Sequence, residues 1–184
     1  MKNPTIDTVS FDSYSGGYMI AKHFEEQGYK NFGIVSGPGD AVDAVFRKNG
    51  FVDHISEKED LQLVWEYKGD FSSESGRDAF NDYKKQNIPN MAIFGCNDHT
   101  CFGFMKEALE AGYRIPKDFI IAGYDNLSFC DNFTPELTSV ATNFDILGKR
   151  AIRTIENMVN DSNEIIRQFS MVPVEIVIRS STQN

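Results

Sequence analysis

Short apolar runs alternate with longer amphipathic segments along the chain, and this alternation restricts the possible folds more than any other feature of the sequence. Runs such as Asn31–Gly37, Met91–Gly95 and Phe119–Tyr124 have the length of strands. Segments of helical spacing, such as Ser73–Lys85 and Asp98–Glu110, lie between them. Strand–helix units of about 25 to 30 residues are typical of parallel sheets covered by helices on both faces. We therefore predict an α/β fold with such a sheet.

The same periodicities predict further elements on either side of this central part. Gly28 is a natural stop for the first predicted helix, and Asp40 is a natural cap for the second. The additional strands are predicted at Thr8–Phe11, Leu61–Tyr67 and, split by Pro173, within Phe169–Arg179; the additional helices at 16–28, from Asp40 to about Ile55, and at Asp145–Asn160.

Composition and charge exclude several classes of protein. The 184 residues carry 27 acidic and 18 basic side chains, a net charge of -9, so this polypeptide alone is a poor binder of nucleic acid. No run of about 18 apolar residues predicts a membrane span, and the first residues lack the apolar core of a signal peptide. Cys96, Cys101 and Cys130 form no Cys-x-x-Cys pair. We therefore expect a reduced, cytoplasmic setting and no membrane partner.

Polar or aromatic side chains follow the carboxyl ends of several predicted strands. In open parallel sheets, ligands bind beyond these strand ends. Carboxylates, amides, an arginine and an aromatic ring are the groups that a small polyhydroxylated ligand needs. The residues concerned are Arg47 and the loop 37–39, Phe71, Asn97 and Asp98, and Asp125 and Asn126.

Most of these residues also have an ordinary structural interpretation. Asp125 is a suitable residue for an Asx turn or a helix cap. Asn97 and Asp98 are both typical N-cap residues, so we expect one to cap the following helix and the other, Asn97, to face the ligand. Arg47 lies four residues after Asp43, a spacing that favours an ion pair along one helix. Phe71 is of a residue type that is common in protein cores, so its ordinary interpretation is a core residue.

Three chemical motifs are incomplete. The Gly-Pro-Gly-Asp loop at 37–40 lacks the Lys and Ser/Thr of a phosphate-binding loop. Cys96, Asp98, His99 and Cys101 include metal-binding residue types, but no second Cys/His pair completes a tetrahedral site. No Gly-x-Gly-x-x-Gly follows a predicted strand, and no Ser/His/Asp order has a suitable spacing. We therefore predict no metal, no cofactor, no catalytic residues and no enzymatic activity.

An ordered series of motifs resembles the effector-binding domain of LacI/GalR-family transcriptional regulators. The resemblance covers almost the whole chain, and its specificity lies in the order of the motifs. The motifs are VSFDSYSGGYMIAKHFEEQGYKNFGIVSGP at 9–38, RKNGF at 47–51, AIFGCNDHTCFGFMKEALEAGYRIPKDFIIAGYDN at 92–126, FTPELTSV at 133–140 and VEIVIRSST at 174–182.

This resemblance implies a periplasmic-binding-protein type I-like fold, in which two similar subdomains are joined by three crossovers. Residues 17–141 and 172–184 would form the C-terminal subdomain. Residues 1–16 and 142–171 would belong to the N-terminal subdomain. The DNA-binding headpiece and the first part of the sensor are expected to lie outside this sequence.

The resemblance also implies roles for individual residues. Asp125 would bind a hydroxyl group or a base, Arg47 would lie in the cleft, and Phe71 would be a stacking platform. Ala41 and Thr142 differ from many relatives, which carry larger polar side chains at the first position and Gln at the second. The predicted ligand-binding set is Asp125, Arg47, Phe71, Asn97, Asp43 and Thr142.

The function implied is that of a sensor. A small effector (a sugar, sugar phosphate or purine) would bind between the subdomains and alter operator binding by a homodimer, with DNA contacted only through the headpiece. An alternative is a periplasmic sugar-binding protein of a transport system, which shares the fold; an upstream helix-turn-helix or signal peptide would distinguish the two. A nucleotide-dependent enzyme ranks last. The apolar face of the predicted helix Asp145–Asn160 further predicts self-association.

Overall fold

The computed structural model describes residues 6–86, 88–160 and 169–183. Parts of the segments assigned by resemblance, residues 1–5 and 161–168, lie outside the described residues. Strands are β1 (Thr8–Phe11), β2 (Asn31–Ser36), β3 (Gln62–Lys68), β4 (Met91–Gly95), β5 (Phe119–Asp125), β6 (Thr138–Ala141), β7 (Phe169–Val172) and β8 (Glu175–Val177). Helices are α1 (Ser13–Glu26), α2 (Val42–Ser56), α3 (Ser73–Gln86), α4 (Asp98–Glu110) and α5 (Phe144–Asn160).

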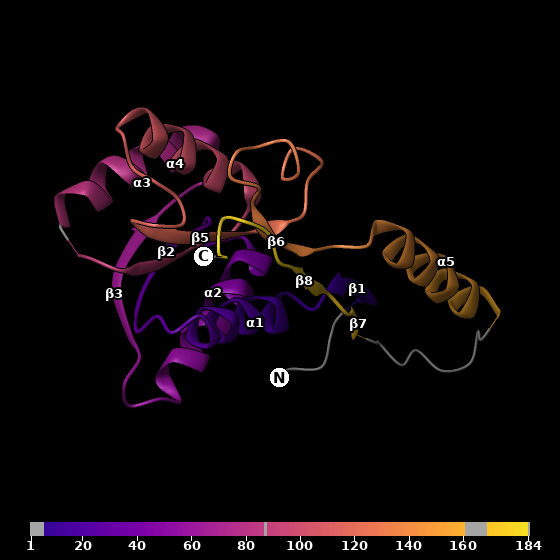
Figure 1. Ribbon diagram of the computed structural model, residues 1–184. Helices are drawn as coiled ribbons and strands as arrows, with labels where there is room; N and C mark the ends of the chain where they lie inside the picture. Colours follow the sequence, from indigo (N-terminus) through magenta and orange to yellow (C-terminus); the bar gives the residue numbers. More distant parts are fainter. Residues whose placement is uncertain (1–5, 87, 161–168, 184) are drawn as a thin grey trace.

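The main sheet has six strands in the order β3-β2-β4-β5-β6-β8 (Figure 1). The first five strands pair in parallel, and β8 pairs with β6 in the antiparallel sense. The carboxyl ends of β2, β4 and β5 therefore meet at one edge of the sheet. The predicted α/β class with a parallel sheet is confirmed.

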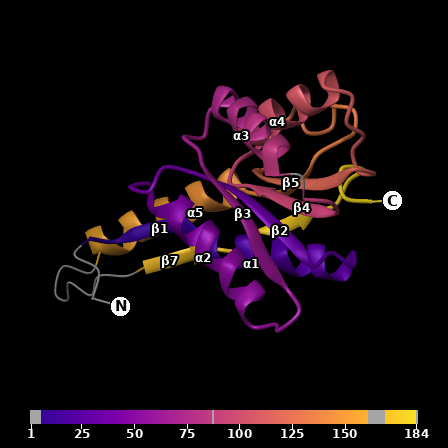
Figure 2. The same ribbon diagram turned by 90° about the vertical axis from the view of Figure 1, so that its left-hand side faces the viewer.

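Helices cover both faces of this sheet, as Figure 2 shows, because the side chains of each strand alternate between two apolar clusters. On β4, Ala92 and Phe94 pack with α1 and α2, whereas Met91 and Ile93 pack with α3 and α4. The same alternation along β2 and β5 makes two cores, one on each side of the sheet, whose central strands β2, β4 and β5 are almost entirely buried.

A second, two-stranded sheet lies to one side of the main sheet. It consists of β1 and β7, which pair in parallel, and α5 contacts β1 beside it (Figures 1 and 2). The rings of Phe11 and Phe144 meet edge to face with centroids 5.3 Å apart. Much of the apolar surface of α5 remains exposed to solvent; the exposed residues on it are Phe144, Ile146, Ile152, Ile155, Met158 and Val159.

Three predictions of local structure were wrong. The first helix begins at Ser13 rather than at 16, because the Asp12 carboxylate accepts from the Ser15 backbone N–H and caps it. The second helix is not capped by Asp40, since its N-cap residue is Ala41, whose side chain makes no capping bond. The segment Thr138–Ala141 was not predicted as a strand. It is only four residues long and half polar, so it lacks a strong local pattern.

Candidate functional site

The candidate site begins at the carboxyl end of β5, where the backbone makes an unusual corner. Asp125 has φ 107° and Asn126 has φ 52°, so two consecutive non-glycine residues adopt positive φ values. Such conformations persist only where surrounding contacts hold them, and they are concentrated at functional positions. The corner directs the Asp125 carboxylate towards α2, where its Oδ1 lies 3.1 Å from Nη2 of Arg47.

Arg47 joins the carboxyl ends of β4 and β5 through one guanidinium group. Besides its ion pair with Asp125, its Nη1 donates to the backbone carbonyl of Cys96 over 2.6 Å. Its charged group also lies 3.7 Å from the ring centroid of Tyr124. Arg47 is only 8% exposed. The structure therefore pairs Arg47 with Asp125 rather than with Asp43, which was the alternative suggested by helical spacing.

Phe71 also lies close to Arg47, with its ring centroid 5.9 Å from the guanidinium carbon. Its φ is 72°, and Nδ2 of Asn97 donates to its carbonyl oxygen over 2.9 Å. Oδ1 of Asn97 accepts from the backbone N–H of Thr100 and caps α4. Both polar atoms of Asn97 are thus used within the chain. The expectation that Asp98 would cap α4 and leave Asn97 for the ligand was wrong about the cap, because Asn97 is itself the cap; a contact of Asn97 with a ligand stays a prediction.

The two remaining predicted residues also lie beside this cluster. Asp43, in the first turn of α2, accepts from the hydroxyls of Ser13 and Ser10 over 3.0 and 3.3 Å. Thr142 donates from its hydroxyl to the backbone carbonyl of Asp125 over 3.1 Å. The fold therefore brings Arg47, Phe71, Asp125 and Thr142 together at one edge of the sheet, with Asn97 behind Phe71.

Burial and charge act against each other on Asp125. Burial raises the pKa of its carboxyl, the Arg47 guanidinium lowers it, and the negative charge of Asp43 raises it further. Two carboxylates thus share the neighbourhood of one guanidinium, which is already paired. Such a surface accepts hydrogen bonds from O–H or N–H groups and does not attract an anion.

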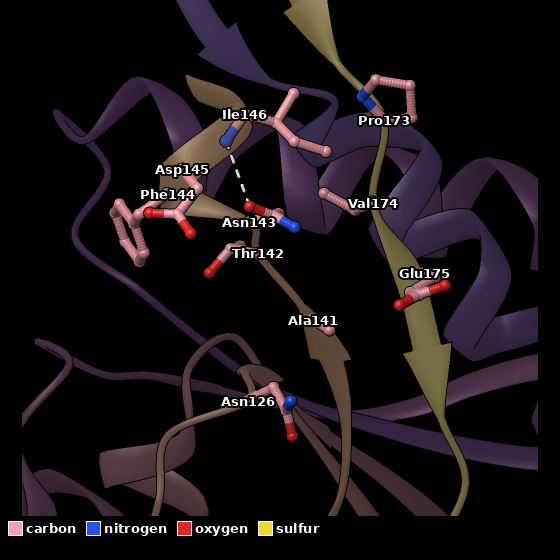
Figure 3. Close-up of a pocket in the computed structure, with 10 residues that line it drawn as sticks. All are labelled: Asn126, Ala141, Thr142, Asn143, Phe144, Asp145, Ile146, Pro173, Val174 and Glu175. Atoms are coloured by element: carbon pink, nitrogen blue, oxygen red, sulfur yellow. Dashed lines mark hydrogen bonds between the residues drawn. The ribbon is translucent and has the colours of Figure 1, made fainter. Parts of the chain in front are cut away.

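A pocket of about 650 Å³ lies next to this cluster, between the segments that lead from β6 to α5 and from β7 to β8 (Figure 3). Thr142 is the one member of the predicted set that lines it. Its polar lining includes Asn126, Asn143 and Glu175, none of which was in the predicted set. Asn143 was missed because β6 was not recognised as a strand, and the family resemblance pointed only to Thr142 at its carboxyl end. The full lining is Asn126, Ala141, Thr142, Asn143, Phe144, Asp145, Ile146, Pro173, Val174 and Glu175.

The described residues contain neither a metal-binding cluster nor a membrane-spanning helix. Within 6–86, 88–160 and 169–183, no group of three or more His, Cys, Asp or Glu side chains is arranged to hold a metal ion. Cys96 and Cys101 are buried and unpaired by disulfides, and burial raises the pKa of both thiols. Of the helices described, none has the length and apolar character needed to cross a bilayer.

Comparison with known proteins identifies clear similarities. Residues 21–182 match the periplasmic binding protein-like domain. The chain is 32% identical to the HTH-type transcriptional repressor PurR of Mannheimia succiniciproducens, over 98% of this chain and 54% of the relative. It is 33% identical to the PurR repressor of Photobacterium profundum, over 100% of this chain and 55% of the relative. The chain thus spans about half the length of these curated relatives.

A solved structure agrees with these sequence similarities. A LacI family transcriptional regulator from Enterococcus faecalis V583, with bound ribose, superposes with a TM-score of 0.83 at 29% identity. The match covers 95% of this chain and 62% of that one. The predicted periplasmic-binding-protein-like fold and the resemblance to a LacI-type effector-binding domain are both confirmed.

Proposed function

Because this chain belongs to the periplasmic binding protein-like family, we propose that it is the effector-sensing part of a LacI/GalR-type transcriptional regulator. The observation that carries the proposal is the Arg47–Asp125 pair at the carboxyl edge of the main sheet. Phe71 lies beside this pair and Thr142 holds the backbone of Asp125. The site has the acceptors and the aromatic face that a small polar effector requires.

In this proposal, Asp125 and Asp43 accept hydrogen bonds from the effector, and Arg47 keeps the Asp125 carboxylate in a fixed orientation. Phe71 covers an apolar face of the ligand ring. Binding changes the relative orientation of two subdomains. An effector shifts such an equilibrium only through its different affinities for the two arrangements.

The proposed subdomains are residues 17–141 with 172–184, and 1–16 with 142–171. The separate β1–β7 sheet, with α5 beside it, supports this division. The pocket in Figure 3 would then lie at the crossovers between the two parts. Operator DNA would be bound by a headpiece outside this sequence, in a cytoplasmic homodimer, and the sensor part itself would catalyse no reaction.

Among sugars, sugar phosphates and purines, the charges of this wall favour an uncharged ligand that donates hydrogen bonds. Arg47 is 8% exposed, and its two terminal nitrogens already contact Asp125 and the Cys96 carbonyl, so it offers little accessible surface to a phosphate. Asp43 and Asp125 would repel an anion. The ribose bound to the regulator from Enterococcus faecalis supports a sugar.

A sugar-binding protein of a transport system is the alternative, because it shares the fold. The repressors among the curated relatives support the regulator instead. The sequence upstream in the same reading frame provides a simple test. A helix-turn-helix there supports the regulator, whereas a secretory signal peptide supports transport.

Ligand screening by thermal shift tests the proposed function directly. The panel contains neutral monosaccharides, their phosphates and purine bases. A ligand present at 100 times its dissociation constant adds about 2.7 kcal/mol to the free energy of unfolding, a shift that is readily measured.

The matched variants are Asp125→Ala and Asp118→Ala. Each aspartate pairs with an arginine at one end of β5: Asp125 is its last residue, whereas Asp118 precedes its first residue and pairs with Arg114. We expect Asp125→Ala to remove the ligand-induced shift and Asp118→Ala to keep it. An equal response of both variants would exclude Asp125 from the site, and turnover of any panel compound would exclude a pure sensor.

A further inference from the structure

Asp98 is a buried carboxylate that the proposed effector site does not use. It is the first residue of α4 and is 0% exposed. Carboxylates are almost never fully buried without partners, because removing the charge from water is costly. The Asp98 carboxylate therefore needs hydrogen-bond partners that compensate for its burial.

All the side-chain and backbone donors to Asp98 come from the chain that follows β5 and from β6. Oδ1 accepts from the hydroxyl of Ser139 over 2.6 Å, and Oδ2 accepts from the backbone N–H of Leu127 over 2.8 Å. The thiol of Cys130 also donates to Oδ2, over 3.2 Å. The Ser139 hydroxyl oxygen in turn accepts from the backbone N–H of Asn126 over 3.0 Å.

These bonds hold the backbone of two consecutive residues, Asn126 and Leu127, immediately after Asp125. That segment contains the corner in which Asp125 and Asn126 adopt positive φ values. A non-glycine residue remains in this region only if its surroundings fix it. The Asp98 carboxylate supplies one direct bond and, through Ser139, one relayed bond to the corner.

The space around Asp98 is also shaped for a carboxylate. A Cβ atom added at Gly123 would collide with Oδ1 of Asp98. Gly123 lies on β5, two residues before Asp125. The absence of a side chain there leaves space for the Asp98 carboxylate beside the Asp125–Asn126 corner.

We propose that Asp98 is a positioning residue for the effector site, which fixes the Asp125–Asn126 corner and so aims the Asp125 carboxylate at Arg47. Asp98 does not contact the effector in this scheme. The importance of the corner rests on the proposed function, but the positioning itself is a property of the ligand-free protein. It is therefore tested without any effector, and its failure is distinct from a failure of the sensor proposal.

The test compares Asp98→Ala and Ser139→Ala with the control Ser181→Ala. Ser139 and Ser181 are both 0% exposed, and the side-chain hydroxyl of each makes two hydrogen bonds. Those of Ser181 go to Thr138 and Ile121 within the same sheet and do not reach the corner. Two quantities are followed by NMR: amide hydrogen exchange at Asn126 and Leu127 relative to the amides of β4, and the titration of the Asp125 carboxyl carbon.

We expect Ser139→Ala to speed exchange of the Asn126 amide on the order of tenfold relative to β4, as the loss of one hydrogen bond predicts. Asp98→Ala should expose the Leu127 amide as well. Both variants should change the pKa of Asp125, because its distance from Arg47 changes. Ser181→Ala should lower the stability of the whole chain but leave the exchange ratio and the Asp125 titration unchanged.

If Asp98→Ala does not fold, Ser139→Ala decides the question alone. An unchanged exchange ratio in Ser139→Ala overturns the proposal. So does faster exchange with an unaltered Asp125 titration, because Asp98 would then merely hold a loop together. An equal response in Ser181→Ala also overturns it, since the effect would not be specific to the corner.

Discussion

Replacing Arg47 by Met should destabilise the protein far more than replacing an exposed arginine. Met keeps an apolar side chain of similar length but removes the guanidinium, which lies over the ring of Tyr124. Two groups then lose their partner: the Asp125 carboxylate and the carbonyl oxygen of Cys96. Asp125 is left beside Asp43, whose charge already disfavours its ionised form.

The magnitude follows from the burial of the two partners. Breaking a fully buried ion pair costs about 3–5 kcal/mol. The side chain of Asp125 is 26% exposed, so water recovers part of this, whereas the Cys96 carbonyl adds the penalty of an unsatisfied acceptor. We therefore expect a loss of about 2–3 kcal/mol in the free energy of unfolding. At a urea dependence of roughly 2 kcal/mol per molar, the midpoint should fall by about 1–1.5 M.

Urea unfolding followed by tryptophan fluorescence measures this loss. The single tryptophan, Trp65, is buried on β3 and reports global unfolding. The control is Arg114→Met, which removes an exposed pair with Asp118 and should cost about 0–1 kcal/mol. Equal midpoints for the two variants would refute the reasoning. So would a double-mutant cycle of Arg47→Met with Asp125→Asn that gives no coupling energy.

Three further predictions concern titration, assembly and DNA. Burial raises the pKa of Asp98 to about 6 from 3.8, so the folded state binds this proton more tightly than the unfolded chain, and stability should fall as pH rises from about 4 to 6. This pKa difference corresponds to about 3 kcal/mol of unfolding free energy at most. In Asp98→Asn, the urea midpoint should therefore depend less on pH across this range, and an unchanged pH dependence would contradict the raised pKa of Asp98. The exposed apolar face of α5 should make the chain self-associate in sedimentation velocity at micromolar concentration, and Ile152→Asp with Ile155→Asp should weaken this, whereas a monomeric wild-type chain would argue against it. With a net charge of -9, the chain by itself should not retain operator DNA at physiological salt in a mobility-shift assay; salt-sensitive, sequence-specific retention would disprove this.

The sequence by itself determined most of the elements and the edge of the sheet at which they present polar groups. Hydrophobic spacing is a property of neighbouring residues, so α4 was predicted at Asp98–Glu110 with the bounds that the structure has. The position of Asp125 after an apolar strand was equally visible, because a parallel strand delivers its last side chain to the carboxyl edge.

The tertiary structure alone decided which side chains meet. Local spacing offered Asp43 as the partner of Arg47, but the fold brings in Asp125 and a carbonyl 49 residues away. The exchange of roles between Asn97 and Asp98 has the same origin. Asn97, which caps α4, also donates to the carbonyl of Phe71, 26 residues earlier, and the buried carboxylate of Asp98 accepts from Ser139, 41 residues later. Such pairings depend on strand order and register, which bring distant residues within hydrogen-bonding distance, whereas helical and strand periodicity describe only the residues within a turn or two along the chain.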